Sequence, residues 1–278
     1  MAVRVAVGDP RAISVDFPGV ATGNVTVSVT SARAGTTVGP FVATSVGAGV
    51  YSYQLIDSMV DAVDDLRLVF TGTVAGINYT RKEWVEVAGA YYFEVAEARA
   101  TGPIDSTFTD EDIRRQRTSV EDQIEANCDT SFVARYIEER VSGRAQFLRL
   151  TQNYILSLIE VTEDSVDVTS DAQLDGRYLW RGGGAEWASG HRNVVVKTEV
   201  GFDERPPADL RRKAIEATRY TLLRERRQGL PPQAVTIATE AGTMRLAIAG
   251  LRQPFGLPEV DAVLLKWARR VAVPIAGT

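Results

Sequence analysis

The chain has 278 residues, of which 45% are hydrophobic and 24% charged, a balance typical of folded globular proteins and not of disordered ones. Its 36 acidic and 31 basic residues give a net charge of −5, which argues against a free-standing nucleic-acid binder because such proteins need a basic surface. The single cysteine, Cys128, excludes an intrachain disulfide. No signal peptide and no run of 18 apolar residues is visible, so we expect no membrane contact and assembly in a cytosol.

Residues 1–98 have the pattern of an all-β domain. From Asn24 to Ala32 the valines alternate with threonine and serine, and this period of two marks a half-buried strand. Similar segments follow at residues 49–56, 66–74 and 82–89, with glycine and aspartate clusters between them as turn signals. The spacing favours an immunoglobulin-like (Ig-like) sandwich, although the Cys–Trp–Cys core of true immunoglobulin domains is absent.

A linker at residues 99–108 separates this domain from a second one at residues 109–278. Thr109 is a good N-cap for a helix over about 109–127, since three acidic residues follow it in the first turn. Ile113, Val120 and Ile124 lie on one side of this helix. The sequence therefore predicts an α+β multidomain protein, in which the β-sandwich precedes a helical domain with inserted β-hairpins.

The middle of the second domain is again β-like. Residues 130–150 predict two strands around Ser142 and Gly143, and residues 154–168 predict a strand with its turn. A glycine triplet at 182–184 then raises the question of a phosphate-binding loop. Such a loop needs a helix directly after its glycines, but here a valine run follows. The pattern favours a hairpin, across which Trp180 and Trp187 pack.

Two further helices are predicted, over about 207–228 and 257–270, with a small hairpin turning at Ala241 and Gly242 between them. The first helix has a small-residue stripe and a basic face. The basic face is solvated, or else it is turned toward DNA phosphates or an acidic partner. The stripe consists of Leu210, Ala214, Ala217 and Thr221, broadened by Ile215, Leu222 and Leu223, and the basic face of Arg211, Arg212, Lys213, Arg219, Arg224, Arg226 and Arg227.

No catalytic, cofactor or metal site emerges from the residue pattern, and we expect a protein that is not an enzyme. His191 is the only histidine and is expected to be an exposed loop residue. Cys128 is expected to be a buried small hydrophobe. The aspartates of residues 164–176 do not have the spacing of a twelve-residue calcium loop.

The order of elements over residues 105–278 resembles the head-to-tail connector, or adaptor, proteins of tailed bacteriophages. In that family a strand ending in a Gly-aromatic step precedes Pro-x-x-Leu and an alanine-bearing helix. A Gly-x-Pro-x-Val-Asp segment then begins a closing helix that ends in basic residues. The matching residues are Gly201, Phe202, Pro207, Leu210 and Ala214, followed by Gly256, Pro258, Val260, Asp261, Arg269 and Arg270.

The resemblance implies a structural virion protein at the neck, the interface between head and tail. Such adaptors form a ring, generally of twelve copies, beneath the portal protein, extend the DNA channel and dock the next neck or tail protein. Genomic DNA would pass through without sequence-specific binding, and an acidic wall would avoid sticking to it. The Ig-like domain would be an accessory module.

The C-terminal residues 271–278 are the expected point of contact with the portal or a neighbouring subunit. Val271, Val273 and Ile275 alternate along this tail, which can therefore add to an exposed sheet edge as an extended peptide. A frayed or self-packed tail is the alternative.

Two other functions remain open. A carbohydrate- or surface-binding β-module fused to a helical domain would be favoured by an exposed aromatic patch on residues 1–98. An enzyme using carboxylates would be favoured by a concave pocket that holds paired Asp or Glu residues with raised pKa values.

Overall fold

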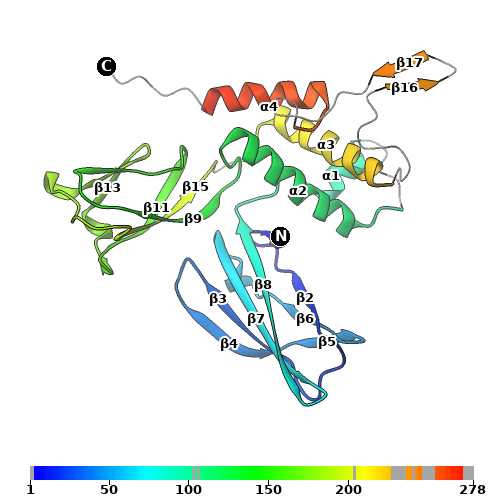
Figure 1. Cartoon of the computed structure of the whole chain (residues 1–278), viewed down its shortest axis with the longest axis horizontal. Coiled ribbons are helices and arrows are strands. Elements are labelled where there is room, and N and C mark those ends of the chain that lie inside the picture. The colour runs from blue at the N-terminus through cyan, green and yellow to red at the C-terminus, as the bar shows by residue number, and fades with distance from the viewer. Residues whose placement is uncertain are drawn as a thin grey trace. The chain divides into compact units, whose positions relative to one another are not determined.

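The computed structural model is a mixed α+β protein, as predicted (Figure 1). It describes residues 3–101, 104, 107–202, 205–226, 236–239, 242–245 and 254–271, with the backbone alone at 224–226, 236–239, 242–245 and 269–271. The chain divides into two compact units, residues 1–91 with 133–203 and residues 92–132 with 204–278. In the described residues, no helix combines the length and the apolar character that crossing a membrane requires.

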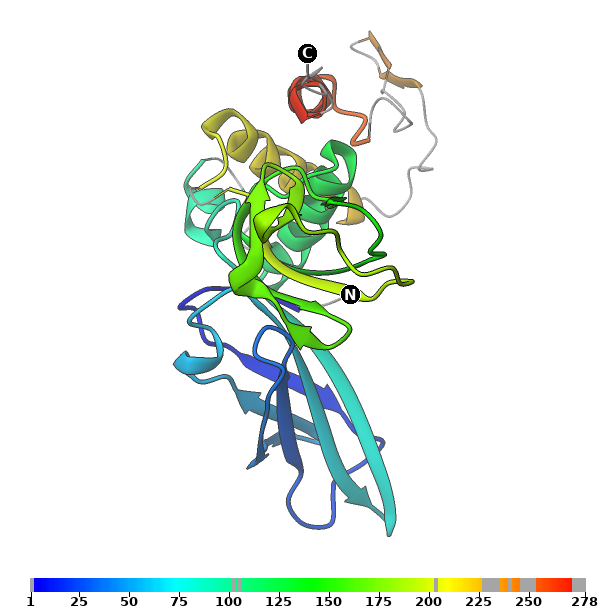
Figure 2. The ribbon, with the colours of Figure 1, turned by 90° about the vertical axis from the view of Figure 1, so that its left-hand side faces the viewer.

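Residues 3–91 form two sheets whose inner faces share one hydrophobic core (Figure 2). One sheet has the order β1-β8-β7-β3-β4, in which β1 runs parallel to β8, and the other has the order β2-β6-β5. The strands are β1 Val3–Ala6, β2 Ala12–Asp16, β3 Thr26–Ser31, β4 Thr37–Val42, β5 Thr44–Gly47, β6 Val50–Gln54, β7 Asp64–Val74 and β8 Ile77–Ala88, with a 3₁₀ turn at Asp57–Met59. The Ig-like description of this two-layer structure stays a prediction.

The alternation around β3 explains why one face of this strand is turned to the core between the layers. Val25, Val27 and Val29 are at most 2% exposed, as the period of two predicted, while the threonine and serine residues between them point away from the core. Burying one such side chain contributes about 1.5–3 kcal/mol, so a one-residue shift of register would be costly.

The second β part of the same unit, residues 133–203, contains two further sheets around a separate core. A four-stranded sheet has the order β12-β11-β15-β9, and a three-stranded sheet has the order β10-β14-β13. The elements are β9 Arg135–Val141, β10 Phe147–Arg149, β11 Ile155–Glu163, β12 Val166–Asp167, β13 Ala172–Asp175, β14 Tyr178–Arg181 and β15 Val194–Val200, with 3₁₀ turns at Thr169–Asp171 and Gly182–Gly184.

The hairpin predicted around the glycine triplet is wrong. Strand β14 pairs with β10 and β13, whereas β15 pairs with β11 and β9, so the loop between β14 and β15 connects two different sheets. Alternation identifies a strand but not its partner, because packing distant in sequence decides the pairing. Trp187 is buried at 2% exposure and Trp180 is 38% exposed, so the two tryptophans occupy different environments.

The second unit is built on helices α1 Val95–Ala100, α2 Asp110–Cys128, α3 Ala208–Arg226 and α4 Pro258–Val271. Strands β16 Thr236–Thr239 and β17 Gly242–Arg245 pair antiparallel, and Ala241, at the predicted turn, lies outside the described residues. The predicted N-cap of α2 is confirmed: Thr109 and Asp112 form a reciprocal capping box, a device that contributes about 1 kcal/mol.

The first two residues of the predicted linker at 99–108 belong to α1, and the rest leads to α2; residues 102, 103, 105 and 106 are outside the described part. Both helices belong to the second unit, so the chain passes between the units near 91–92, 132–133 and 203–204. That residues 1–98 fold on their own stays a prediction.

Candidate functional site

The Gly-aromatic step that follows β15 is a close backbone crossing. Gly201 has φ +110°, and a Cβ added there would lie 2.1 Å from the carbonyl oxygen of Val133. The amide of Gly201 donates to the carbonyl of Tyr154 over 2.7 Å, and the Tyr154 ring packs at 4.9 Å from the ring of Phe202. Glycine is therefore required here both by conformation and by space.

The Pro-x-x-Leu segment begins α3. Pro207 precedes the helix, and its carbonyl accepts from the amide of Arg211 over 2.9 Å. Leu210 and Ala214 are fully buried, at 0% exposure, together with Ala217. The small side chains of this stripe let the other helices of the unit approach the α3 backbone closely.

The Gly-x-Pro-x-Val-Asp segment forms a closed turn into α4. Asp261 is 2% exposed and accepts from the amide of Phe255 over 3.0 Å, so its carboxylate holds the loop that leads into the helix. Burial raises the pKa of Asp261, against the opposing effect of the backbone amides that donate to it. Gly256 has φ +66° in this loop, and Val260 is fully buried one residue before Asp261.

Ion pairs connect α3 with α4 and use part of the predicted basic face. Lys213 contacts Glu216 at 2.7 Å and Glu259 at 2.8 Å, and hydrogen bonds to these two carboxylates raise the pKa of Lys213. Lys266 contacts Asp209 at 2.8 Å. These cations are therefore engaged within the unit, while the side chains of Arg224, Arg226 and Arg227 lie outside the described residues.

A buried charged pair on α2 holds residues 92–93, where the second unit begins. Arg117 and Glu121 are 1% and 0% exposed. Arg117 donates to the carbonyl of Phe93 over 2.9 Å, and Glu121 accepts from the amide of Tyr92 over 2.9 Å. The pair thus satisfies backbone groups of residues 92–93 that would otherwise be buried without partners.

The tryptophan-flanked loop is held by Glu163. Its carboxylate pairs with Arg181 and accepts from the amide of Ala188 over 2.6 Å. The guanidinium of Arg181 lies 5.6 Å from the centre of the Trp187 ring. The loop is therefore structural, and the next helix begins only at Ala208, which does not suit a phosphate-binding loop.

The two residues considered for nucleophilic chemistry lie in different settings. His191 is exposed in the loop before β15, and Cys128 is 2% exposed at the end of α2. Burial, with a smaller effect of the Glu125 carboxylate, raises the pKa of Cys128 to about 11, so its thiol stays protonated at neutral pH. Among the described residues, no group of three or more His, Cys, Asp or Glu is placed to hold a metal ion.

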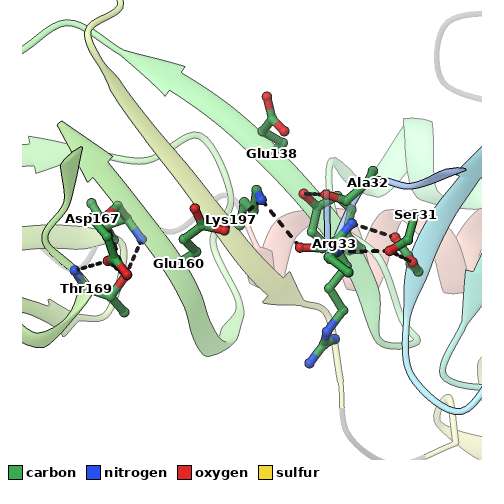
Figure 3. A network of polar contacts seen from close by, with 12 residues as sticks. Ser31, Ala32, Arg33, Glu138, Glu160, Asp167, Thr169 and Lys197 are labelled. Carbon is green, nitrogen blue, oxygen red and sulfur yellow. Dashed lines mark hydrogen bonds and ion pairs between the residues drawn. The ribbon is translucent and has the colours of Figure 1, made fainter. Parts of the chain in front are cut away.

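A polar network joins the two β parts of the first unit (Figure 3). Lys197 contacts Glu160 at 2.7 Å and donates to the carbonyl of Arg33 over 3.4 Å. The hydroxyl of Tyr136 donates to the carbonyl of Ala32 over 3.2 Å, and Ser31 donates to Asp64. The chain segment after β3 is therefore tied to β9 and β15.

Two arginines reinforce this joint by pairing with one carboxylate. Arg4 and Arg135 each lie 2.8 Å from Glu86; burial opposes ionisation of Glu86, but the two guanidinium groups outweigh it and lower its pKa. The pKa of Asp65, the cross-strand neighbour of Glu86, shifts in the opposite direction. Burial, then the carboxylates of Glu86 and Asp64, raise the pKa of Asp65 to about 6.

A cavity of about 330 Å³ opens in the sandwich between β3, β4 and the 3₁₀ turn at Asp57–Met59. Its apolar lining includes Phe41 and Met59, and its acidic lining consists of Asp61 and Asp64. Asp65 and Asp261, two carboxyl groups with a raised pKa, do not line it. This cavity therefore does not provide the combination that would favour an enzyme using carboxylates.

Sequence reasoning missed an exposed aromatic surface on the three-stranded sheet. Phe147, Tyr178 and Trp180 are 45%, 36% and 38% exposed, and the Phe147 ring lies 5.5 Å from that of Tyr178 and 5.1 Å from that of Trp180. The alternation of Tyr178 and Trp180 about the buried Leu179 was the signal that could have revealed it. The position of Phe147 beside them depends on pairing that alternation does not show.

The proposed contact residues at the C-terminus fall at the limit of the described chain. Val271 is the last residue of α4, and its side chain is not described. Val273 and Ile275 lie outside the described residues. Arg269 and Arg270 are described by their backbone alone.

Solved chains with structural similarity to this one include two from the necks of GTA particles. One, from the neck of a native GTA particle computed with C12 symmetry, is 14% identical, with a TM-score of 0.43, over 66% of this chain and 91% of that chain. The other, from the neck of an empty GTA particle computed with C6 symmetry, is 13% identical, with a TM-score of 0.45, over 67% and 93%. These similarities are too slight to establish a common fold. No protein-family model matches the sequence, and no curated protein matches it either.

Proposed function

We propose that the chain is a structural virion protein of a tailed phage, a head-to-tail adaptor that forms a ring beneath the portal. It extends the DNA channel and docks the next neck or tail protein. The proposal rests on the resemblance of residues 105–278 to the adaptor family, since the motifs occur in the family's order along the chain. The Ig-like sandwich would be an accessory module, and the protein would not be an enzyme.

The positions of the motif residues support the proposal. Gly201 makes a backbone crossing that another residue would obstruct, Leu210 and Ala214 form the buried stripe of α3, and Asp261 closes the turn into α4. These residues determine the path of the backbone and the packing of the helices. Proteins with the same fold would therefore share them. This is the observation that carries the proposal.

The C-terminal tail is the proposed joining element. A contact repeated around a symmetry axis gains by avidity, so a short tail with few apolar residues can suffice in a ring. We therefore propose that residues 271–278 order on the portal or on a neighbouring subunit, with Val271, Val273 and Ile275 as the apolar contacts.

Binding to portal-bearing particles tests the function. The purified chain should cosediment with portal complexes, and images of the product should show a ring of adaptor density at the portal vertex. A control with particles that lack the portal should retain none of the chain. If the chain stays in the supernatant at saturating concentration, or decorates both kinds of particle equally, the adaptor proposal is wrong.

The carbohydrate-binding alternative receives less support. It predicted a clustered aromatic patch on residues 1–98, but the aromatic cluster lies on residues 147–180, and the exposed aromatic side chain of residues 3–91 is the single Trp84. A glycan screen of the full chain would favour this alternative if binding were lost on substituting Trp84.

A further inference from the structure

The outer face of the three-stranded sheet has a regular arrangement of side chains. Tyr178 and Trp180 lie on the central strand β14. Arg149 on β10 and Asp175 on β13 stand directly opposite Tyr178, one on each side. In the same way, Phe147 on β10 and Gln173 on β13 flank Trp180. We call these six exposed residues the aromatic face: Phe147, Arg149, Gln173, Asp175, Tyr178 and Trp180.

The rear of the same sheet shows that this face is not part of the core. Leu148 and Leu179, which alternate with the aromatic residues, are 4% and 0% exposed and belong to the hydrophobic core of residues 133–203. The sheet already has its apolar layer on that side. Three contiguous aromatic rings are exposed on the opposite side, which is typical of an interaction surface.

The exposed area sets the size of the contact. Rings that can each bury about 150–250 Å², exposed here by 36–45%, leave roughly 250 Å² of aromatic surface. A stable interface buries about 800 Å² on each partner, so the rings with the polar residues around them fit a weak and reversible contact.

The aromatic face is self-complementary in charge. Arg149 and Asp175 lie on opposite sides of Tyr178, so a two-fold axis parallel to β14 would place Arg149 of each copy over Asp175 of the other. The same operation places Tyr178 and Trp180 over their own counterparts and Phe147 over Gln173. Two sheets packed face to face prefer strand directions within about 30° of each other, which this axis satisfies.

We propose that the aromatic face binds the aromatic face of a second copy of this chain, in a weak two-fold dimer centred on Tyr178 and Trp180. The occupant is a second copy because the face supplies both members of each complementary pair. Such a dimer does not depend on the proposed ring. Its contact is the same patch on both copies, whereas a cyclic ring joins two different patches of neighbouring copies.

Self-association of the full chain is the first test. Sedimentation velocity over a concentration series should show a reversible monomer–dimer equilibrium. W180A should weaken dimerisation at least about 30-fold, because a central aromatic residue of an interface typically contributes that factor and both copies lose it. W84A is the matched control, since Trp84 is 53% exposed on the other β part of the unit, and it should dimerise like the wild type.

Charge exchange tests the two-fold geometry. R149E places two carboxylates opposite each other at both ends of the dimer, and D175K places two cations there, so each variant alone should be monomeric. An equimolar mixture of R149E and D175K should dimerise, because both contacts then join a cation to a carboxylate. Both substitutions are at exposed positions, so the monomers should stay folded.

The outcomes separate this inference from the adaptor function. A wild-type chain that stays monomeric throughout the series, a W180A variant that dimerises normally, or a mixture that fails to associate would each overturn the dimer. Binding of an oligosaccharide or another protein to the face without self-association would do the same. None of these results bears on cosedimentation with portal complexes, which tests the ring separately.

Discussion

Replacing Gly201 by alanine should destabilise the first unit more than any ordinary surface substitution. Two costs combine at this position. The φ of +110° is a conformation that residues with a Cβ rarely adopt, at a cost of about 1–3 kcal/mol. The added methyl group would also lie 2.1 Å from the carbonyl oxygen of Val133, so the backbone itself must move. We expect a total loss of at least about 3 kcal/mol of unfolding free energy.

Gly183 is the matched control. Its φ is +68°, but a Cβ added there meets no atom within 4 Å. G183A should therefore incur only the left-handed backbone cost of about 1–2 kcal/mol. The difference between G201A and G183A isolates the contribution of the close backbone approach.

Equilibrium urea unfolding, followed by tryptophan fluorescence and circular dichroism, measures both variants against the wild type. Trp187 lies in the core of residues 133–203 and reports on the part of the chain that contains Gly201. If G201A loses no more stability than G183A, the steric reasoning at the Gly-aromatic step is wrong. The structural role assigned to that motif would then fail with it.

Four further predictions address the remaining sites. H191A should change stability by no more than about 0.5 kcal/mol, and loss of a measurable hydrolytic or transferase activity in it would overturn the non-enzyme proposal. Deleting residues 271–278 should leave thermal unfolding unchanged and abolish ring formation on portal complexes; undiminished occupancy would place the interface on the helices instead. Limited proteolysis should cut first within residues 97–108, and recovery of no stable fragment near either predicted size would contradict two separable domains. Asp65 binds its proton more tightly in the folded than in the unfolded state, with a pKa of about 6 against the ordinary 3.8, so its contribution to stability falls as pH rises through this range. D65N should accordingly gain stability relative to the wild type between about pH 4 and pH 7, and parallel pH profiles would exclude this effect.

The helices were predictable from the sequence because their signals are local. Thr109 caps α2 through a residue three positions away, and the spacing of Ile113, Val120 and Ile124 already defines the buried side of that helix. The prolines before α3 and at the start of α4 likewise mark helix beginnings without reference to the rest of the fold.

Strand pairing and buried charge were not predictable, because both depend on residues distant in the chain. The valine run of β15 looks the same whether it pairs with β14 or with β9. Arg117 and Glu121 bind backbone groups of Phe93 and Tyr92, which lie 24 and 29 residues earlier in the chain. The aromatic face likewise depends on strand pairing, since β10 joins it from a segment well before β14.

The repeated passage of the chain between its two units has a consequence for synthesis on the ribosome. Helix α2 emerges early, but its partner α3 begins only at Ala208, after the whole second β part has been translated. The first unit is also incomplete until that β part has appeared. The nascent chain must therefore carry the apolar side of α2 without α3 and α4 while residues 129–207 are translated. The capping box and the neighbouring pairs Glu111–Arg114 and Asp112–Arg115 can hold the helix through local contacts alone during that interval.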